Sequence, residues 1–86
     1  QGSNDVNLEE ISCENLSYCF AGKSIMELDV RNESGANIIG LKHADNTYLV
    51  NPKPDVILSS NDQLFILGSP EQIKKLKAVL EDTTRL

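Results

Sequence analysis

The sequence predicts an α+β fold in which a strand, a short helix, three strands and a long helix follow one another. Two helix-capping patterns mark the helices, SIME at residues 24–27 and SPEQ at residues 69–72. Short apolar runs bounded by turn residues separate these patterns and are typical of strands. Because the strands are grouped instead of alternating with helices, we expect a mainly antiparallel sheet with the helices packed on it.

The first strand is predicted over residues 6–13, where Val6, Leu8 and Ile11 lie among polar residues. The alternation is imperfect, so we expect a bulge near Glu9 and Glu10. Residues 14–23 show no regular spacing of apolar residues and are expected to form a loop that carries some buried aromatic side chains.

The short helix is predicted to begin at Ser24, because Glu27 three residues later completes an S-x-x-E capping box. Ile25 and Leu28 share a face that would pack on the sheet. The NESG stretch at residues 32–35 is expected to stop this helix after about two turns. Gly35 suits the left-handed residue of the turn.

Three strands are predicted next. Residues 36–43 form a strand with enough apolar residues for burial on both faces, and residues 48–50 return after an Asp-Asn turn. Prolines at 52 and 54 end that strand because they cannot donate to a ladder. Residues 63–67 form the clearest strand of the chain.

The long helix is expected to begin after Ser69 as N-cap, with Pro70 in the first turn and Gln72 bonding back to the cap. Spacing of i, i+3 and i+7 gives it one apolar stripe toward the sheet, formed by Ile73, Leu76 and Leu80. Three lysines of this helix, Lys74, Lys75 and Lys77, are expected to face solvent.

Length and charge limit the function classes. The 86 residues suffice for one domain of modest stability, of the kind that works as a dimer or as part of a larger protein. The net charge of -5 argues against nucleic acid as a partner. No apolar run is long enough to cross a bilayer and no signal peptide is visible. We expect residues 1–7 to be a tag or linker remnant, residues 8–82 to be the domain and residues 83–86 to be a tail.

The residues give little support for an enzyme. His43 is the single histidine, and we expect it to be an exposed residue at a strand end; no G-x-S-x-G elbow or phosphate-binding glycine loop is present. Cys13 and Cys19 are too few for a disulfide framework or a zinc site, so we expect two reduced thiols and no metal site. The sequence therefore predicts a non-enzymatic domain.

Asp29 and Arg31, with Asn37 beyond the Gly35 turn, are the remaining candidates for a site. Two interpretations stay open at this point. Asp29 and Arg31 could form a helix-end salt bridge, with Arg31 near the terminal carbonyl groups. Alternatively, Arg31 and nearby amides could face an anion or a partner subunit.

Several motifs together resemble one known family. They are GKSIMELDVR at residues 22–31, GANIIGL at 35–41, NP at 51–52, the segment from Leu58 through Asp62 to Gly68, and SPE at 69–71. In order and spacing they are similar to the C-terminal domain of RCK regulatory modules, the TrkA-C domain, over roughly residues 8–80.

The resemblance implies a cytosolic, ligand-sensing regulatory domain of a potassium channel or a Trk/Ktr-type potassium transport protein. Such a domain is involved in cation transmembrane transport and lies on the cytoplasmic side, as part of or attached to an integral membrane protein. It implies a homodimer, an upstream RCK N-terminal Rossmann domain and a potassium-conducting membrane domain. The alternative is a passive assembly module in an anion exchanger or a sodium-coupled symporter, with no small-molecule ligand.

The resemblance also implies a ligand. We expect no cofactor within this fragment alone, but some family members bind cyclic di-AMP at the dimer interface, so that this or another nucleotide is implied between two subunits. A divalent cation, or no ligand, is the alternative. Two copies would meet across the short capped helix and the turn after it. Position 36, where some binders carry a polar or ring side chain, departs from the family pattern. The implied ligand-binding residues are Ile25, Met26, Asp29, Arg31, Ala36, Asn37 and Ile38.

Overall fold

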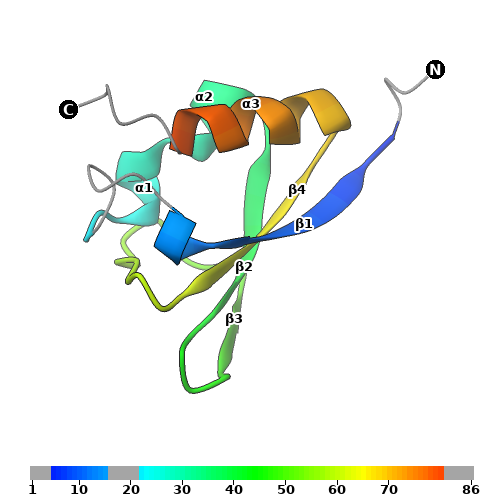
Figure 1. The fold of residues 1–86 in the computed structure, drawn as a ribbon. Helices are drawn as coiled ribbons and strands as arrows, with labels where there is room; N and C mark the ends of the chain where they lie inside the picture. Colours follow the sequence, from blue (N-terminus) through cyan, green and yellow to red (C-terminus); the bar gives the residue numbers. More distant parts are fainter. Residues whose placement is uncertain (1–4, 16–21, 81–86) are drawn as a thin grey trace.

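A computed structural model describes residues 5–15 and 22–80 of the chain. Within these residues the predicted order of strands and helices is confirmed, although the short helix is divided in two (Figure 1). A single 3-10 turn at Cys13–Asn15 follows the first strand. The elements are β1 (Asn7–Ser12), α1 (Ile25–Leu28), α2 (Val30–Ser34), β2 (Asn37–Lys42), β3 (Tyr48–Val50), β4 (Gln63–Gly68) and α3 (Pro70–Leu80).

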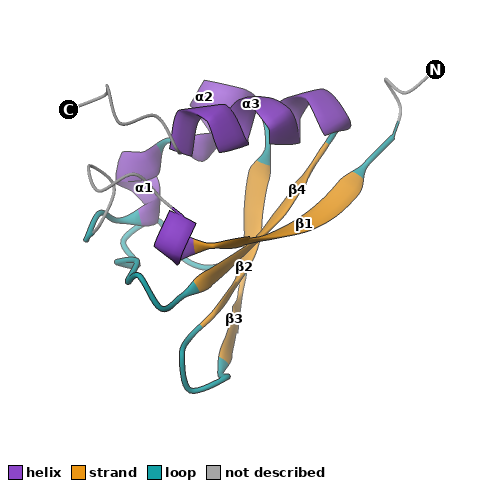
Figure 2. Ribbon diagram, in the orientation of Figure 1, coloured by secondary structure: helices purple, strands orange, loops and turns teal. Residues whose placement is uncertain are grey.

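The strands form one sheet in the order β1-β4-β2-β3, and every neighbouring pair is antiparallel. Helices α2 and α3 lie side by side across one end of the sheet, and the β2–β3 hairpin extends away from them (Figure 2). The predicted α+β class is therefore confirmed. In the described part of the chain no helix has the length and apolar character needed to cross a membrane.

The core lies between the sheet and α3, on what we call the inner face of the sheet. The predicted stripe of α3 is buried there against Ile11, Leu41, Leu64 and Ile66 of the strands. At the edge, the Lys77 ammonium lies 2.7 Å from a Glu9 carboxylate oxygen and ties α3 to β1. Lys74 and Lys75 are exposed as expected, whereas Lys77 is half-buried.

The predicted bulge in the first strand is wrong, because β1 pairs with β4 residue by residue without a shift. The bulge lies in β2, between Ile38 and Gly40. Residues directly opposite each other in an antiparallel sheet share a face. Ile38 lies opposite Ile66 of the inner face, while Gly40 lies opposite Phe65 of the other face. The extra residue, Ile39, allows both placements in one strand.

The prediction of a single helix stopped by NESG is also wrong. Residues 32–34 belong to α2, and the break falls earlier, at Asp29, which has the left-handed angles φ 54° and ψ 39°. Leu28 and Val30 on either side of the break are both buried. In a continuous helix, side chains two positions apart point about 200° apart, so both could not face one core. The break at Asp29 lets both residues pack inward.

The predicted caps are confirmed. The Ser24 amide donates to Glu27 Oε1 over 2.8 Å and the Glu27 amide donates to Ser24 Oγ over 3.2 Å. The same exchange starts α3, where the amides of Ser69 and Gln72 donate to each other's side chains over 2.9 and 3.1 Å. Gly35, at φ 83°, ends α2 as expected.

Candidate functional site

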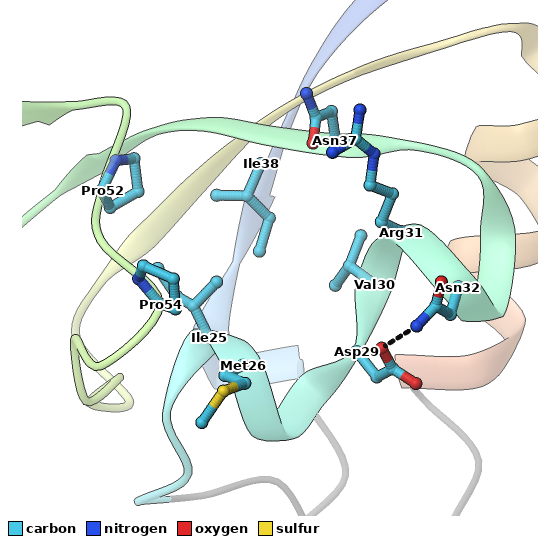
Figure 3. A pocket seen from close by; sticks show the side chains of 10 residues that line it. All are labelled: Ile25, Met26, Asp29, Val30, Arg31, Asn32, Asn37, Ile38, Pro52 and Pro54. Atoms are coloured by element: carbon cyan, nitrogen blue, oxygen red, sulfur yellow. Dashed lines mark hydrogen bonds between the residues drawn. The ribbon is translucent and has the colours of Figure 1, made fainter.

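A groove of about 440 Å³ lies between the two short helices, the start of β2 and the loop after β3. Figure 3 shows its side chains from close by. Six of the seven predicted ligand-binding residues line it, together with four that the sequence reasoning did not include. The six are Ile25, Met26, Asp29, Arg31, Asn37 and Ile38, and the four are Val30, Asn32, Pro52 and Pro54.

Backbone hydrogen bonds hold the α1 wall of the groove against the loop after β3. The amides of Ile25 and Met26 donate to the carbonyls of Val56 and Pro54 over 3.0 and 2.9 Å. Ser24 forms an isolated antiparallel bridge with Ile57 just outside the helix. Because these amides belong to the first turn of α1, the loop supplies acceptors that the short helix itself cannot.

The α2 wall is anchored from the other side. Val30 is buried in the core, and the buried Ser34 hydroxyl donates to the Val30 carbonyl over 2.7 Å while accepting from the Ala36 amide over 3.1 Å. These bonds satisfy the polar groups where α2 turns into β2. Both walls are therefore fixed by the fold before any ligand enters.

The groove has an apolar end and a polar end. Ile25, Ile38 and the two prolines gather at one end, and Arg31 and Asn37 lie together at the other (Figure 3). Arg31 and Asn37 are exposed, and Met26 is 66% exposed at the rim. This arrangement can accept a flat apolar group beside an anion, since a guanidinium forms charge-assisted hydrogen bonds with phosphate or carboxylate oxygens.

The Asp29 carboxylate faces Asn32, whose side-chain amide donates to Asp29 Oδ1 over 2.8 Å (Figure 3). Among residues 5–15 and 22–80, the ion pairs are Lys77 with Glu9 and His43 with Asp62, and neither includes Arg31. The helix-end salt bridge between Asp29 and Arg31, one of the two interpretations that the sequence left open, is thus not formed in the structure. The guanidinium remains available at the polar end of the groove.

Ala36 is the predicted ligand-binding residue that does not line the groove. Its side chain is fully buried, and a Cβ placed on Gly68 would come within 3.1 Å of the Ala36 Cβ. Position 36 therefore belongs to the packing between β2 and the end of β4. Pro52 and Pro54, which the sequence marks only as the end of a strand, form part of the wall instead.

Other reactive groups in the described residues are occupied or inert. Burial, and then the charge of Asp62, raise the pKa of the Cys13 thiol to about 12, so that this free cysteine stays protonated. His43 is half-exposed, with Nδ1 at 3.1 Å from Asp62 Oδ1, and the buried Asp62 also accepts from the Ser59 amide. Within the same residues no group of three histidine, cysteine or acidic side chains is placed to hold a metal ion. Cys19 and the predicted buried aromatics of the 14–23 loop (Tyr18 and Phe20) lie outside the described residues.

The chain is similar to segments of two potassium channel proteins of Methanocaldococcus jannaschii. Potassium channel protein 1 is 32% identical over 59 residues, which are 69% of this chain and 17% of that protein. Probable potassium channel protein 2 is 29% identical over 77 residues, which are 90% of this chain and 22% of that protein. The chain thus spans about a fifth of the length of these relatives.

Solved structures share the fold. The GsuK channel bound to NAD has a TM-score of 0.76 at 26% identity, over 91% of this chain and 14% of that chain. The RCK C domain of the potassium transport protein KtrA in complex with cyclic di-AMP has a TM-score of 0.73 at 25% identity, over 87% and 84%. The RCK_C domain dimer of S. agalactiae BusR, also in complex with cyclic di-AMP, has a TM-score of 0.74 at 29% identity, over 85% of this chain and 93% of that chain.

A family model described as the TrkA-C domain matches residues 8–81, nearly the whole chain. The chain belongs to the TrkA-C domain family.

Proposed function

We propose that this chain is a ligand-sensing regulatory domain of a potassium channel or a Trk/Ktr-type potassium transport protein. It acts on the cytoplasmic side of the membrane, as a homodimer, downstream of an RCK N-terminal Rossmann domain and a potassium-conducting membrane domain. Family membership supports this proposal, as do the potassium channel relatives and the GsuK and KtrA structures.

The groove is the observation that carries the proposal. Ile25, Ile38 and Pro54 offer an apolar wall for a purine ring, and Arg31 and Asn37 offer hydrogen-bond donors to a phosphate beside it. A nucleotide presents both groups at once. We therefore propose a nucleotide ligand, with cyclic di-AMP first, since the similar KtrA and BusR domains were solved in complex with it.

A ligand in this groove would regulate the protein by binding alone, without a catalysed reaction. The described residues that line the groove include no nucleophile paired with a base, and they come from four separate parts of the fold. A ligand changes the state of a protein only through a difference in affinity between two arrangements. We propose that these are two arrangements of the paired domains, and that the bound nucleotide favours one of them.

Calorimetric titration with cyclic di-AMP, NAD and AMP tests the proposal. We expect cyclic di-AMP to bind, and Arg31→Ala to weaken that binding roughly 10- to 100-fold, because a charge-assisted hydrogen bond contributes about 1.5–3 kcal/mol. Arg31→Lys should retain part of the affinity. Lys74→Ala removes an equal charge from the exposed side of α3 and should change nothing. Flat titrations with all three nucleotides would contradict the sensing function and favour the passive assembly module.

A further inference from the structure

The sheet ends in two edge strands, β1 and β3, which differ in how far they can pair with another chain. An edge strand presents unpaired N–H and C=O groups, and short length, proline or a bulge prevents further pairing there. β3 is three residues long and is followed by Pro52 and Pro54. β1 is six residues long, has no proline and pairs with β4 without a bulge. Within residues 5–15 and 22–80 no other strand pairs with β1, so one of its sides is open.

The register shows which backbone groups of β1 face this open side. Just beyond the strand, and in the same register, the Cys13 amide donates to the Asp62 carbonyl over 2.9 Å. Hydrogen-bonded and non-hydrogen-bonded pairs alternate along an antiparallel ladder. The N–H and C=O groups of Leu8, Glu10 and Ser12 therefore point away from β4. A strand laid along the open side would bond to these three residues.

A hollow of about 250 Å³ lies between β1 and the first turns of α3 (Figure 1). Two side chains of β1 and one stripe of α3 line it, namely Asn7, Glu9, Pro70, Ile73, Lys74 and Lys77. Because successive side chains of a strand point to opposite faces, every second side chain of a strand added to β1 would point toward this hollow. The edge thus offers both backbone partners and a place for side chains.

The charges in the hollow favour an acidic side chain, although the chain has a net charge of -5. The Lys77 ammonium lies 2.7 Å from a Glu9 carboxylate oxygen, so these two charges neutralise each other. Lys74 is exposed, and the ion pairs among the described residues do not include it. A carboxylate placed opposite Asn7 would share the hollow with Lys74 and could accept a charge-assisted hydrogen bond from it.

A second copy of the chain does not suit this edge. Side chains that lie opposite each other in a sheet share a face, so two β1 strands could pair along most of their length in two registers. One register would place Glu9 opposite the second copy's Glu9, and the other would place Glu10 opposite the second copy's Glu10. Like charges directly opposite each other destabilise a sheet. The edge therefore favours a segment of different sequence.

We infer that the open side of β1 binds an extended acidic segment of a partner protein. The segment adds an antiparallel fifth strand to the sheet and places one carboxylate opposite Asn7, beside Lys74. Antiparallel addition continues the arrangement of every other pair in this sheet. The hollow shares no residue with the nucleotide groove, so this interaction is separate from the proposed ligand site.

Binding of synthetic peptides to the full chain, measured by fluorescence anisotropy with an uncharged dye, tests the charge. The probe is Thr-Val-Thr-Val-Thr-Val-Glu with a C-terminal amide, and its matched control has lysine in place of glutamate. We expect the glutamate peptide to bind more tightly than the lysine peptide. Lys74→Ala should weaken its binding about fivefold, because ion pairs of exposed residues are weak. Lys75→Ala removes the same charge from an exposed position of α3 outside the hollow and should leave binding unchanged.

N-methylation of the peptide tests the strand pairing. In the antiparallel register the valine amides point to β1 and the threonine amides point away from it. Methylation of the three valine nitrogens should therefore weaken binding about tenfold or more, since it removes several hydrogen bonds. Methylation of the three threonine nitrogens should leave most of the affinity. In hydrogen exchange, the unmodified peptide should protect the amides of Leu8 and Glu10.

Equal affinities of the two N-methylated peptides would overturn strand addition at β1. Equal affinities of the glutamate and lysine peptides, or of the unchanged chain and Lys74→Ala, would overturn the acidic partner. Calorimetry with cyclic di-AMP on the same samples reports on the groove alone. Loss of peptide binding with nucleotide binding intact would therefore count against this inference and leave the proposed function standing.

Discussion

Asp29 adopts an unfavourable backbone conformation that allows the residues on either side of it to be buried. At φ 54° it occupies the left-handed region, which costs most L-residues roughly 1–2 kcal/mol. The burial of both Leu28 and Val30 offsets this conformational cost. Aspartate is among the residues that tolerate this region best, which explains why the position need not be glycine.

We expect Asp29→Gly to leave the free energy of unfolding within about 0.5 kcal/mol of the unchanged chain, because glycine relieves the strain but adds unfolded-state entropy. Asp29→Val should lose about 1–2 kcal/mol, since a β-branched residue is poorly accommodated at positive φ. Urea unfolding measures both. Equal stability of the two variants would show that residue 29 does not need the left-handed region.

Glu27 gives a pH dependence with a definite sign. The hydrogen bond that the Ser24 amide donates to the Glu27 carboxyl is the largest cause that lowers its pKa below the ordinary value of 4.5. The hydrogen bond with the Ser24 side chain is the second cause. Its stabilisation is therefore present above the unfolded-state pKa and is lost as the pH falls through the folded-state value. We expect Glu27→Gln to be less stable than the unchanged chain at pH 7, and the difference in the free energy of unfolding to shrink as the pH is lowered into the acid range. Urea unfolding at pH 7 and at a series of acid pH values checks this, and a constant difference would contradict it.

Sequence patterns were sufficient to predict the capping residues but not the helix break at Asp29. A cap is a local exchange of hydrogen bonds between residues three positions apart, so its residue types can be recognised in the sequence at a fixed spacing. The break at Asp29 depends on which of its neighbours reach the core, and that is decided by α3 and the sheet. The same limit applies to the bulge. The imperfect alternation near Glu9 and Glu10 predicted it in β1, whereas it lies in β2.

Among the secondary-structure elements, α3 depends most clearly on its first turn. Ser69 and Gln72 satisfy each other's amides there. We expect Ser69→Ala to lower the free energy of unfolding by about 1 kcal/mol, the usual cost of an N-cap serine. Ser60→Ala, at an exposed turn position, is the matched control and should have no measurable effect. Equal values for the two variants in urea unfolding would show that the cap contributes nothing.

For the domain as a whole, stability rests on one layer of contacts between α3 and the sheet. Leu76 is completely buried at its centre. We expect Leu76→Ala to lose about 2–5 kcal/mol, a large part of the roughly 4–13 kcal/mol expected for 86 residues. Met26→Ala, at an exposed position, should stay within about 0.5 kcal/mol. Thermal unfolding of the three chains compares them, and a loss below 1 kcal/mol for Leu76→Ala would mean that the core is loosely packed.

At this scale the candidate site was predictable in part. The α1, α2 and β2 residues of the groove lie close together in the chain, so that a family resemblance over residues 22–41 indicated six of them, although it missed Val30 and Asn32. Pro52 and Pro54 come from the far side of the hairpin, and only the folded sheet brings them beside Ile25. Ala36 was included because it lies within the same stretch, although its side chain points into the core.

The bulge at Ile39 also shows where β2 can change its length. Ile38 and Gly40 pair with the consecutive β4 residues Ile66 and Phe65, so a chain without Ile39 would keep both pairings in a regular ladder. The groove residue Ile38 and the core residue Leu41 would then keep their faces, because side chains alternate along a regular strand. A related chain can therefore lose this one residue without disturbing either the groove or the core.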